Sequence, residues 1–124
     1  MKYLIIICRI LLGLMFAILG SNAFLHFIPM PAMQGDAGAF MGVLMRSGYI
    51  YPIAALQILG GLCLLIHPRF VALGLTLLGP VIVNIDLYHI FIDRNGLPIA
   101  AIVTLLSLLL LWVYRYKFPA LFQL

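Results

Sequence analysis

Charged residues are scarce in this sequence. They make up 8% of its 124 residues, seven of the ten are lysine or arginine, and none is glutamate. Ordinary soluble domains carry roughly 25% charged residues. Hydrophobic residues reach 66%, and a soluble protein of this length has too little interior to bury so much apolar surface. The composition excludes an ordinary soluble domain and indicates a single domain whose solvent is largely lipid.

Several chemistries lack the residues that they need. The sequence contains no Cys-x-x-Cys pair, no glycine-rich phosphate loop, no nucleophile triad and no pair of facing histidines that would suit a haem. The net charge of +4 has no basic run behind it, so it fits membrane orientation and contact with anionic lipids rather than nucleic acid. Because no catalytic constellation is complete, the sequence favours a protein without catalysis of its own.

Four apolar stretches reach the length that spans a bilayer, about 17–25 residues. They cover residues 3–27, 49–66, 70–92 and 97–114. Near-continuous apolar runs without period-two alternation predict helices rather than barrel strands. The first stretch could imitate a signal peptide, but Arg9 interrupts its apolar core and the run continues past residues 21–23, so we expect it to be retained. The predicted fold is an all-α integral membrane four-helix bundle, with residues 1–124 as one transmembrane domain.

Basic residues predict the orientation. Four spans place the N-terminus, the second loop and the C-terminus on one side of the membrane. Four basic residues lie on that side: Lys2, Arg69, Arg115 and Lys117. Two lie on the other side, Arg46 and Arg94. The side richer in lysine and arginine faces the cytoplasm. We therefore expect a multi-pass protein of the bacterial inner membrane with both termini cytoplasmic.

The first outer loop, residues 28–48, is long enough for a helix of its own. We predict a short amphipathic helix over about 37–47, with Asp36 as N-cap and Gly48 after its end. Phe40, Val43 and Leu44 form its apolar stripe. Such a helix should lie on the outer membrane surface or fold over the mouth of the bundle.

Two charges fall inside the predicted spans. A charge in mid-membrane costs at least about 2.5–3.5 kcal/mol by insertion scales, so each needs a partner or an aqueous path. A rise of about 1.5 Å per residue places Arg9 about 9 Å from the inner edge and Asp86 about 9 Å from the outer edge. The gap of about 12 Å in a core of about 30 Å argues against a direct salt bridge. We expect Arg9 to reach toward the inner surface or to bind a phospholipid headgroup.

The candidate ligand-binding residues are polar side chains in the outer half of the bundle: Asn22, His26, Gln57, Asn84, Asp86 and His89. Gln57 and Asn84 have the same estimated depth and are expected to face each other across the second and third helices. Asp86 is expected to face the interior, with His89 or a side chain of the first helix as its partner.

Two further groups of residues, a set of possible metal ligands and a pair of cysteines, also have a purely structural explanation. His26, Asp86, His89 and Asp93 offer ligands that suit zinc or iron, yet interfacial histidines usually only reach toward the headgroups, so no metal site is predicted. Cys8 and Cys63 lie at similar depth and could form a redox pair. Buried, inert cysteines are commoner beside a reducing cytosol.

Three segments together resemble the DoxX family of small bacterial membrane proteins. They are the Arg-x-x-x-Gly-x-x-Phe pattern of residues 9–16, the glycine-containing segment of residues 57–65, and the Pro-x-x-x-Asn-x-x-x-x-His pattern of residues 80–89. The resemblance covers nearly the whole chain. It implies a four-helix bundle in the inner membrane and an association with sulfur or thiol redox chemistry, since named members are subunits of thiosulfate:quinone oxidoreductase and others accompany detoxifying enzymes. Many relatives carry glutamate where this chain has Gln57, which puts in doubt a proton relay or an ion pair with Arg9.

Two functions follow as hypotheses. The first is a redox accessory, a membrane subunit that binds a quinone or a redox partner protein in the membrane or cytoplasm; Gln57, Asn84, Asp86 and His89 would then meet the quinone carbonyls. The second is a membrane scaffold or assembly factor whose buried polar residues only fix the helix packing. Membrane lipids are expected partners in both, and a homo-oligomer is compatible with either.

Overall fold

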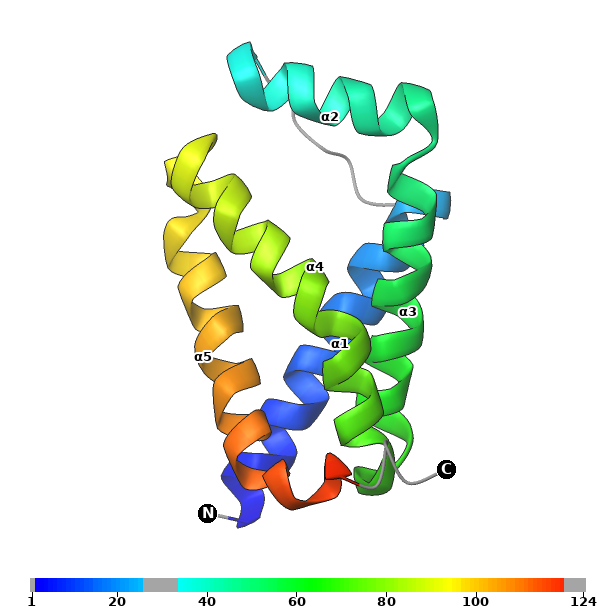
Figure 1. Ribbon diagram of the computed structural model, residues 1–124, viewed down its shortest axis with the longest axis vertical. Helices are drawn as coiled ribbons and strands as arrows, with labels where there is room; N and C mark the ends of the chain where they lie inside the picture. Colours follow the sequence, from blue (N-terminus) through cyan, green and yellow to red (C-terminus); the bar gives the residue numbers. More distant parts are fainter. Residues whose placement is uncertain (1, 26–33, 120–124) are drawn as a thin grey trace.

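The computed structural model describes residues 2–25 and 34–119, and these form helices joined by short turns, with no strand among them (Figure 1). One-turn 3₁₀ segments precede two of the helices, at Pro68–Phe70 and Arg94–Gly96, and a third, Arg115–Lys117, follows the last. The five helices are α1 (Lys2–Leu25), α2 (Gly35–Ser47), α3 (Ile50–Ile66), α4 (Val71–Phe91) and α5 (Leu97–Val113). The predicted all-α class is confirmed.

Not every helix of the described residues has the length and apolarity of a membrane span by itself. Three pass by themselves: α1, α4 with its preceding turn, and α5 with its preceding turn. α3 has 17 residues and passes only together with α2, to which it is bent by 89°, so the described residues contain three candidate spans, or four when this pair counts as one. Only 17% of the most apolar stretch of α5 is buried. Because the rest of that helix surface is apolar yet exposed, lipid is its natural surrounding.

The helices pack in a defined order. α1 packs along α3, α4 packs on α3, and α5 packs against α4 and α1. Figure 1 shows α2 lying across one end of the molecule, here called the α2 end, whereas the start of α1 and the end of α5 lie at the opposite end, the terminal end. α4 leans away from α3 toward the α2 end and approaches α5 there.

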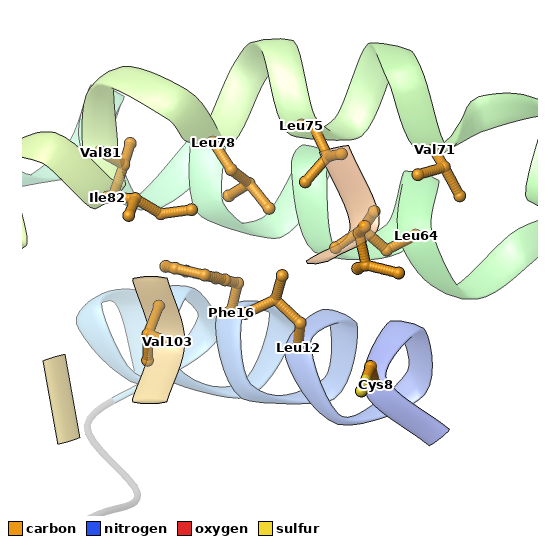
Figure 2. Packing of buried hydrophobic residues seen from close by; sticks show 11 residues of the cluster. Cys8, Leu12, Phe16, Leu64, Val71, Leu75, Leu78, Val81, Ile82 and Val103 are labelled. Atoms are coloured by element: carbon orange, nitrogen blue, oxygen red, sulfur yellow. The ribbon is translucent and has the colours of Figure 1, made fainter. Parts of the chain in front are cut away.

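The core lies where α1, α3, α4 and α5 meet. Figure 2 shows Phe16 and Leu12 of α1 facing Leu78 and Leu75 of α4, with Leu64 of α3 beside them. Phe16, Leu12, Leu64 and Leu78 are each at most 1% exposed. Such side chains gain from close van der Waals packing, which holds helices together where water does not drive them together.

Glycines bring the helix backbones into contact at two interfaces. A Cβ atom at Gly61 would lie 2.7 Å from the carbonyl oxygen of Gly13 in α1, and one at Gly74 in α4 would lie 2.9 Å from that of Gly60. Gly60 and Gly61 therefore serve different partners, Gly60 meeting α4 and Gly61 meeting α1. This close approach is how small residues stabilise helix pairs in lipid.

The start of α2 differs from its prediction. Gln34, in extended conformation, is the N-cap and makes no side-chain cap hydrogen bond, so Asp36 lies in the first turn instead of capping it. The end agrees with the sequence pattern: Gly48 has φ 79°, a left-handed conformation that favours glycine, and its N–H donates to the Met45 carbonyl. The helix therefore runs from Gly35 to Ser47, against a predicted 37–47.

Candidate functional site

Asp86 of α4 meets a partner that the sequence did not suggest. The hydroxyl of Thr104 in α5 lies 2.8 Å from Oδ1 and 2.7 Å from Oδ2 of Asp86 and donates to the carboxylate. Both side chains are half-buried. The prediction of His89 or a first-helix side chain as partner is therefore wrong. The reason is the packing of α4, which turns this side of the helix toward α5.

An open groove runs beside this pair, between α4 and α5. It has a volume of about 360 Å³ and apolar walls apart from Asp86 and Thr104, the other lining residues being Ile90, Leu97, Ala100, Ala101 and Leu105. Leu105 is 66% exposed, so the groove opens to the outer surface of the helices rather than to the core. A carboxylate and a hydroxyl therefore lie within reach of whatever surrounds α4 and α5.

His89 closes the turn between α4 and α5. Its Nδ1 lies 3.0 Å from the Asp93 carbonyl oxygen, and since a carbonyl only accepts, Nδ1 carries the proton and donates it. The Asp93 carboxylate in turn accepts from the backbone N–H of Asn95 at 3.2 Å. Gly96 lies against the His89 ring, with no room for a Cβ atom between them. These residues hold the turn that sets α5 against α4.

Aromatic contacts connect this turn to α2. The ring of Phe40 lies 5.4 Å from that of Tyr88, which meets the His89 ring edge-on at 5.0 Å. Centroid distances of this size are typical of attractive aromatic pairs. α2 is therefore fastened at Gly48 to α3 and through Phe40 to α4, over the α2 end of the molecule (Figure 1).

Gln57 and Asn84 do not form the predicted contact. The Cβ atom of Gln57 lies 3.0 Å from the position of a Cβ at Gly20, which places Gln57 at the α1–α3 interface. Asn84 is exposed on α4. The depth estimate was the basis of this prediction, but α4 leans away from α3 at this level, so two residues of equal depth end up on separate surfaces.

The remaining candidates are dispersed. Asn22 is buried on α1, 9% exposed, and His26 lies outside the described residues. Within 2–25 and 34–119 there is no group of three or more histidine, cysteine, aspartate or glutamate side chains that could hold a metal ion. Asp93 and His89 are joined within the turn, and Asp86 lies in the groove. The structure does not gather the sequence-predicted residues of the described part into one pocket.

Arg9 acts inside the fold. Its Nη1 donates to the Leu64 carbonyl oxygen of α3 at 2.8 Å. In a continuing helix that carbonyl would accept from the N–H of residue 68, but Pro68 has none. A cation at a helix C-terminus also interacts favourably with the helix dipole. The Nε of Arg9 is buried without a partner among the described residues, and the guanidinium links α1 to the end of α3.

The two cysteines are free thiols on different helices. Cys8 is buried on α1 and Cys63 is half-buried on α3. Cys63 faces α4, where its Cβ lies 3.0 Å from the position of a Cβ at Gly74. The described structure uses both as small packing side chains.

Thr104 is the site residue that sequence reasoning missed. It lies seven positions after the start of α5 at Leu97, and Asp86 lies five positions before the end of α4 at Phe91. At about 1.5 Å per residue the two are level to within about 3 Å. The sequence feature that could have indicated the pair is a hydroxyl on one helix at the same depth as the carboxylate of the preceding helix.

A comparison with curated proteins gives a match over about half of this chain. The chain is 39% identical over 67 residues to the uncharacterized protein YwoB of Bacillus subtilis (strain 168), a match that covers 54% of this chain and 43% of that protein. The chain thus spans less than half the length of this curated relative. No family model matches the chain, and no solved structure matches it.

Proposed function

We propose that this protein is a DoxX-like four-helix membrane bundle that acts as a non-catalytic subunit and binds another membrane component through the groove between α4 and α5. In this proposal α2 lies at the outer surface of the bacterial inner membrane and both termini are cytoplasmic. The observation that carries it is the Asp86–Thr104 pair, which faces an open apolar groove. A polar pair on an outward-facing surface of a membrane helix is where another membrane component can bind.

The use of the other polar side chains supports a subunit without catalysis of its own. Arg9 donates to a helix carbonyl, His89 to the turn carbonyl of Asp93, and Asp93 caps Asn95. These contacts stabilise the fold and leave those groups engaged. The groove therefore offers one carboxylate and one hydroxyl, which is enough to bind a partner but is not a catalytic constellation.

A quinone-linked role is the second candidate. The observation in its favour is that the groove, whose walls are apolar apart from Asp86 and Thr104, opens to the surface where the acyl chains would lie. The Thr104 hydroxyl, which donates to Asp86 in the structure, would be the hydrogen-bond donor to a quinone carbonyl. Gln57, Asn84 and His89 do not line the groove, and His89 is engaged with the Asp93 carbonyl, which argues for the subunit role first.

Purification from native membranes in mild detergent tests the proposal. We expect a second membrane protein at constant stoichiometry when bound proteins, lipids and quinones are measured by mass spectrometry. A bound quinone at one per chain, with no second protein, would decide for the quinone-linked alternative. A matched preparation of a Thr104→Val, Asp86→Leu variant shows whether the component depends on the groove.

The charge distribution supports the proposed orientation and gives a prediction. Basic residues gather at the terminal end, at Lys2, Arg69, Arg115 and Lys117, whereas Asp36 and Asp93 accompany Arg46 and Arg94 at the α2 end. Positive charge favours the cytoplasmic side. Alkaline phosphatase, which is active only outside the cytoplasm, should be inactive when fused after Leu124 and active when fused at Gln34. The reverse pattern of activity would overturn the orientation.

A further inference from the structure

The carboxylate of Asp86 keeps acceptor capacity that the protein does not use. A carboxylate offers about four lone-pair sites on its two oxygens. Thr104 supplies a single hydroxyl hydrogen, which the two oxygens share. Because Asp86 also lines the open groove, its remaining sites face the outside of the helix pair. A carboxylate in a membrane-spanning helix is costly unless a partner such as a cation lies beside it.

Within residues 2–25 and 34–119, no lysine or arginine side chain pairs with Asp86. Arg94, above the groove, donates through Nε to the Ile90 carbonyl at 3.2 Å, and Arg46 donates to the Gly42 carbonyl. Arg9 is held at Leu64. The other basic residues lie in or beside segments at the terminal end (Figure 1). A second copy in the same orientation would bring the same arrangement, with no basic side chain at the depth of Asp86 in its described residues.

We propose that the groove takes a lysine or arginine side chain from a transmembrane helix of a different membrane protein, and that this cation pairs with Asp86. The inference rests on the proposed function, since it names the chemistry of the component that the groove binds. The partner's residue is basic in this proposal because a positive charge complements the Asp86 carboxylate. The small, exposed side chain of Ala101 in the groove wall allows a helix backbone to come close, as small residues do in lipid.

Model peptides test the pairing directly. The probe is a leucine–alanine transmembrane peptide of about 24 residues, with one lysine at the depth of Asp86, five residues from its outer end; the control peptide has leucine there. Peptide and full-length protein carry a fluorescence energy-transfer pair at their inner ends, in vesicles of phosphatidylcholine and phosphatidylglycerol. We expect the lysine peptide to associate about tenfold more tightly than the leucine peptide.

Variants of the protein locate the effect. Asp86→Asn should bind both peptides equally, Asp86→Glu should keep the preference for lysine, and Asp36→Asn, which removes a carboxylate outside the groove, should behave as wild type. Equal binding of the two peptides by the wild-type protein would overturn the inference without reference to any variant. A second result would also overturn it: the wild-type protein binds the tetraphenylphosphonium ion but does not prefer the lysine peptide. The site would then bind free organic cations rather than a cation on a partner helix.

The inference and the proposed function can fail separately. If a stoichiometric protein partner copurifies equally with wild type and Asp86→Asn, the proposed function stands and the charge pairing is overturned. If the lysine peptide is preferred but native membranes yield no partner, the site chemistry stands and the subunit role falls.

Discussion

Replacing Gly61 by leucine should prevent the chain from folding to a stable helical protein. A Cβ atom at this position would lie 2.7 Å from the Gly13 carbonyl oxygen and 2.8 Å from the Ala17 backbone nitrogen. Both are backbone atoms of α1, so no side chain can rotate away to make room. α1 and α3 would have to separate, and the close packing that holds helices together in lipid would be lost along their length. We expect little or no monodisperse protein in mild detergent.

The smaller change Gly61→Ala should destabilise the protein by the same clash but leave enough folded protein for its stability to be measured. Overpacking of this kind costs about 1–3 kcal/mol, which should appear as a lower midpoint when far-UV circular dichroism follows unfolding in sodium dodecyl sulfate. Gly42→Ala is the matched control, because a Cβ at Gly42 in α2 meets nothing within 4 Å. Alanine is also the better helix former, by up to about 1 kcal/mol. A Gly61→Ala protein as stable as wild type would show that α1 and α3 are not in backbone contact.

The helices themselves were predictable from the sequence because apolar length alone determines what can cross a bilayer. The runs at 70–92 and 97–114 correspond to α4, Val71–Phe91, and α5, Leu97–Val113. The two helices begin shortly after Pro68 and directly after Gly96, residues that punctuate helices for local steric reasons. The start of α2 was not predictable in this way, because an aspartate two residues away looks like an N-cap although the backbone turns at Gln34.

The site was harder to predict because it depends on how helices turn and lean. Depth follows from counting residues, and it predicts that Arg9 and Asp86 do not pair directly. In the structure each has another partner, Leu64 for Arg9 and Thr104 for Asp86. Direction around the helix axis does not follow from counting. Gly60 and Gly61 are sequence neighbours about 100° apart on a helix, and they contact different helices. Helix tilt does not follow from counting either: Asn84 is exposed because α4 leans away from α3.

The contact between His89 and Gly96 gives a second large effect, which takes the form of a coupling. Gly96 has φ −91°, a conformation open to any residue, so glycine is needed here for space rather than for backbone freedom. A Cβ at residue 96 would overlap the His89 ring, which is held by its hydrogen bond to the Asp93 carbonyl and by the edge of Tyr88. Gly96→Ala should therefore displace the ring and break that bond, at a cost of about 1–3 kcal/mol.

His89→Ala removes the ring and with it the obstacle. Alone it should cost about 0.5–1.5 kcal/mol, the value of a typical hydrogen bond. In the double variant the alanine at 96 has room, so the pair should be no less stable than His89→Ala alone. Unfolding midpoints of the four proteins in detergent give the coupling, which we expect to offset most of the Gly96→Ala cost. Additive losses would mean that the ring does not fill the space beside Gly96, and that another contact sets the α4–α5 turn and, through it, the approach of Thr104 to Asp86.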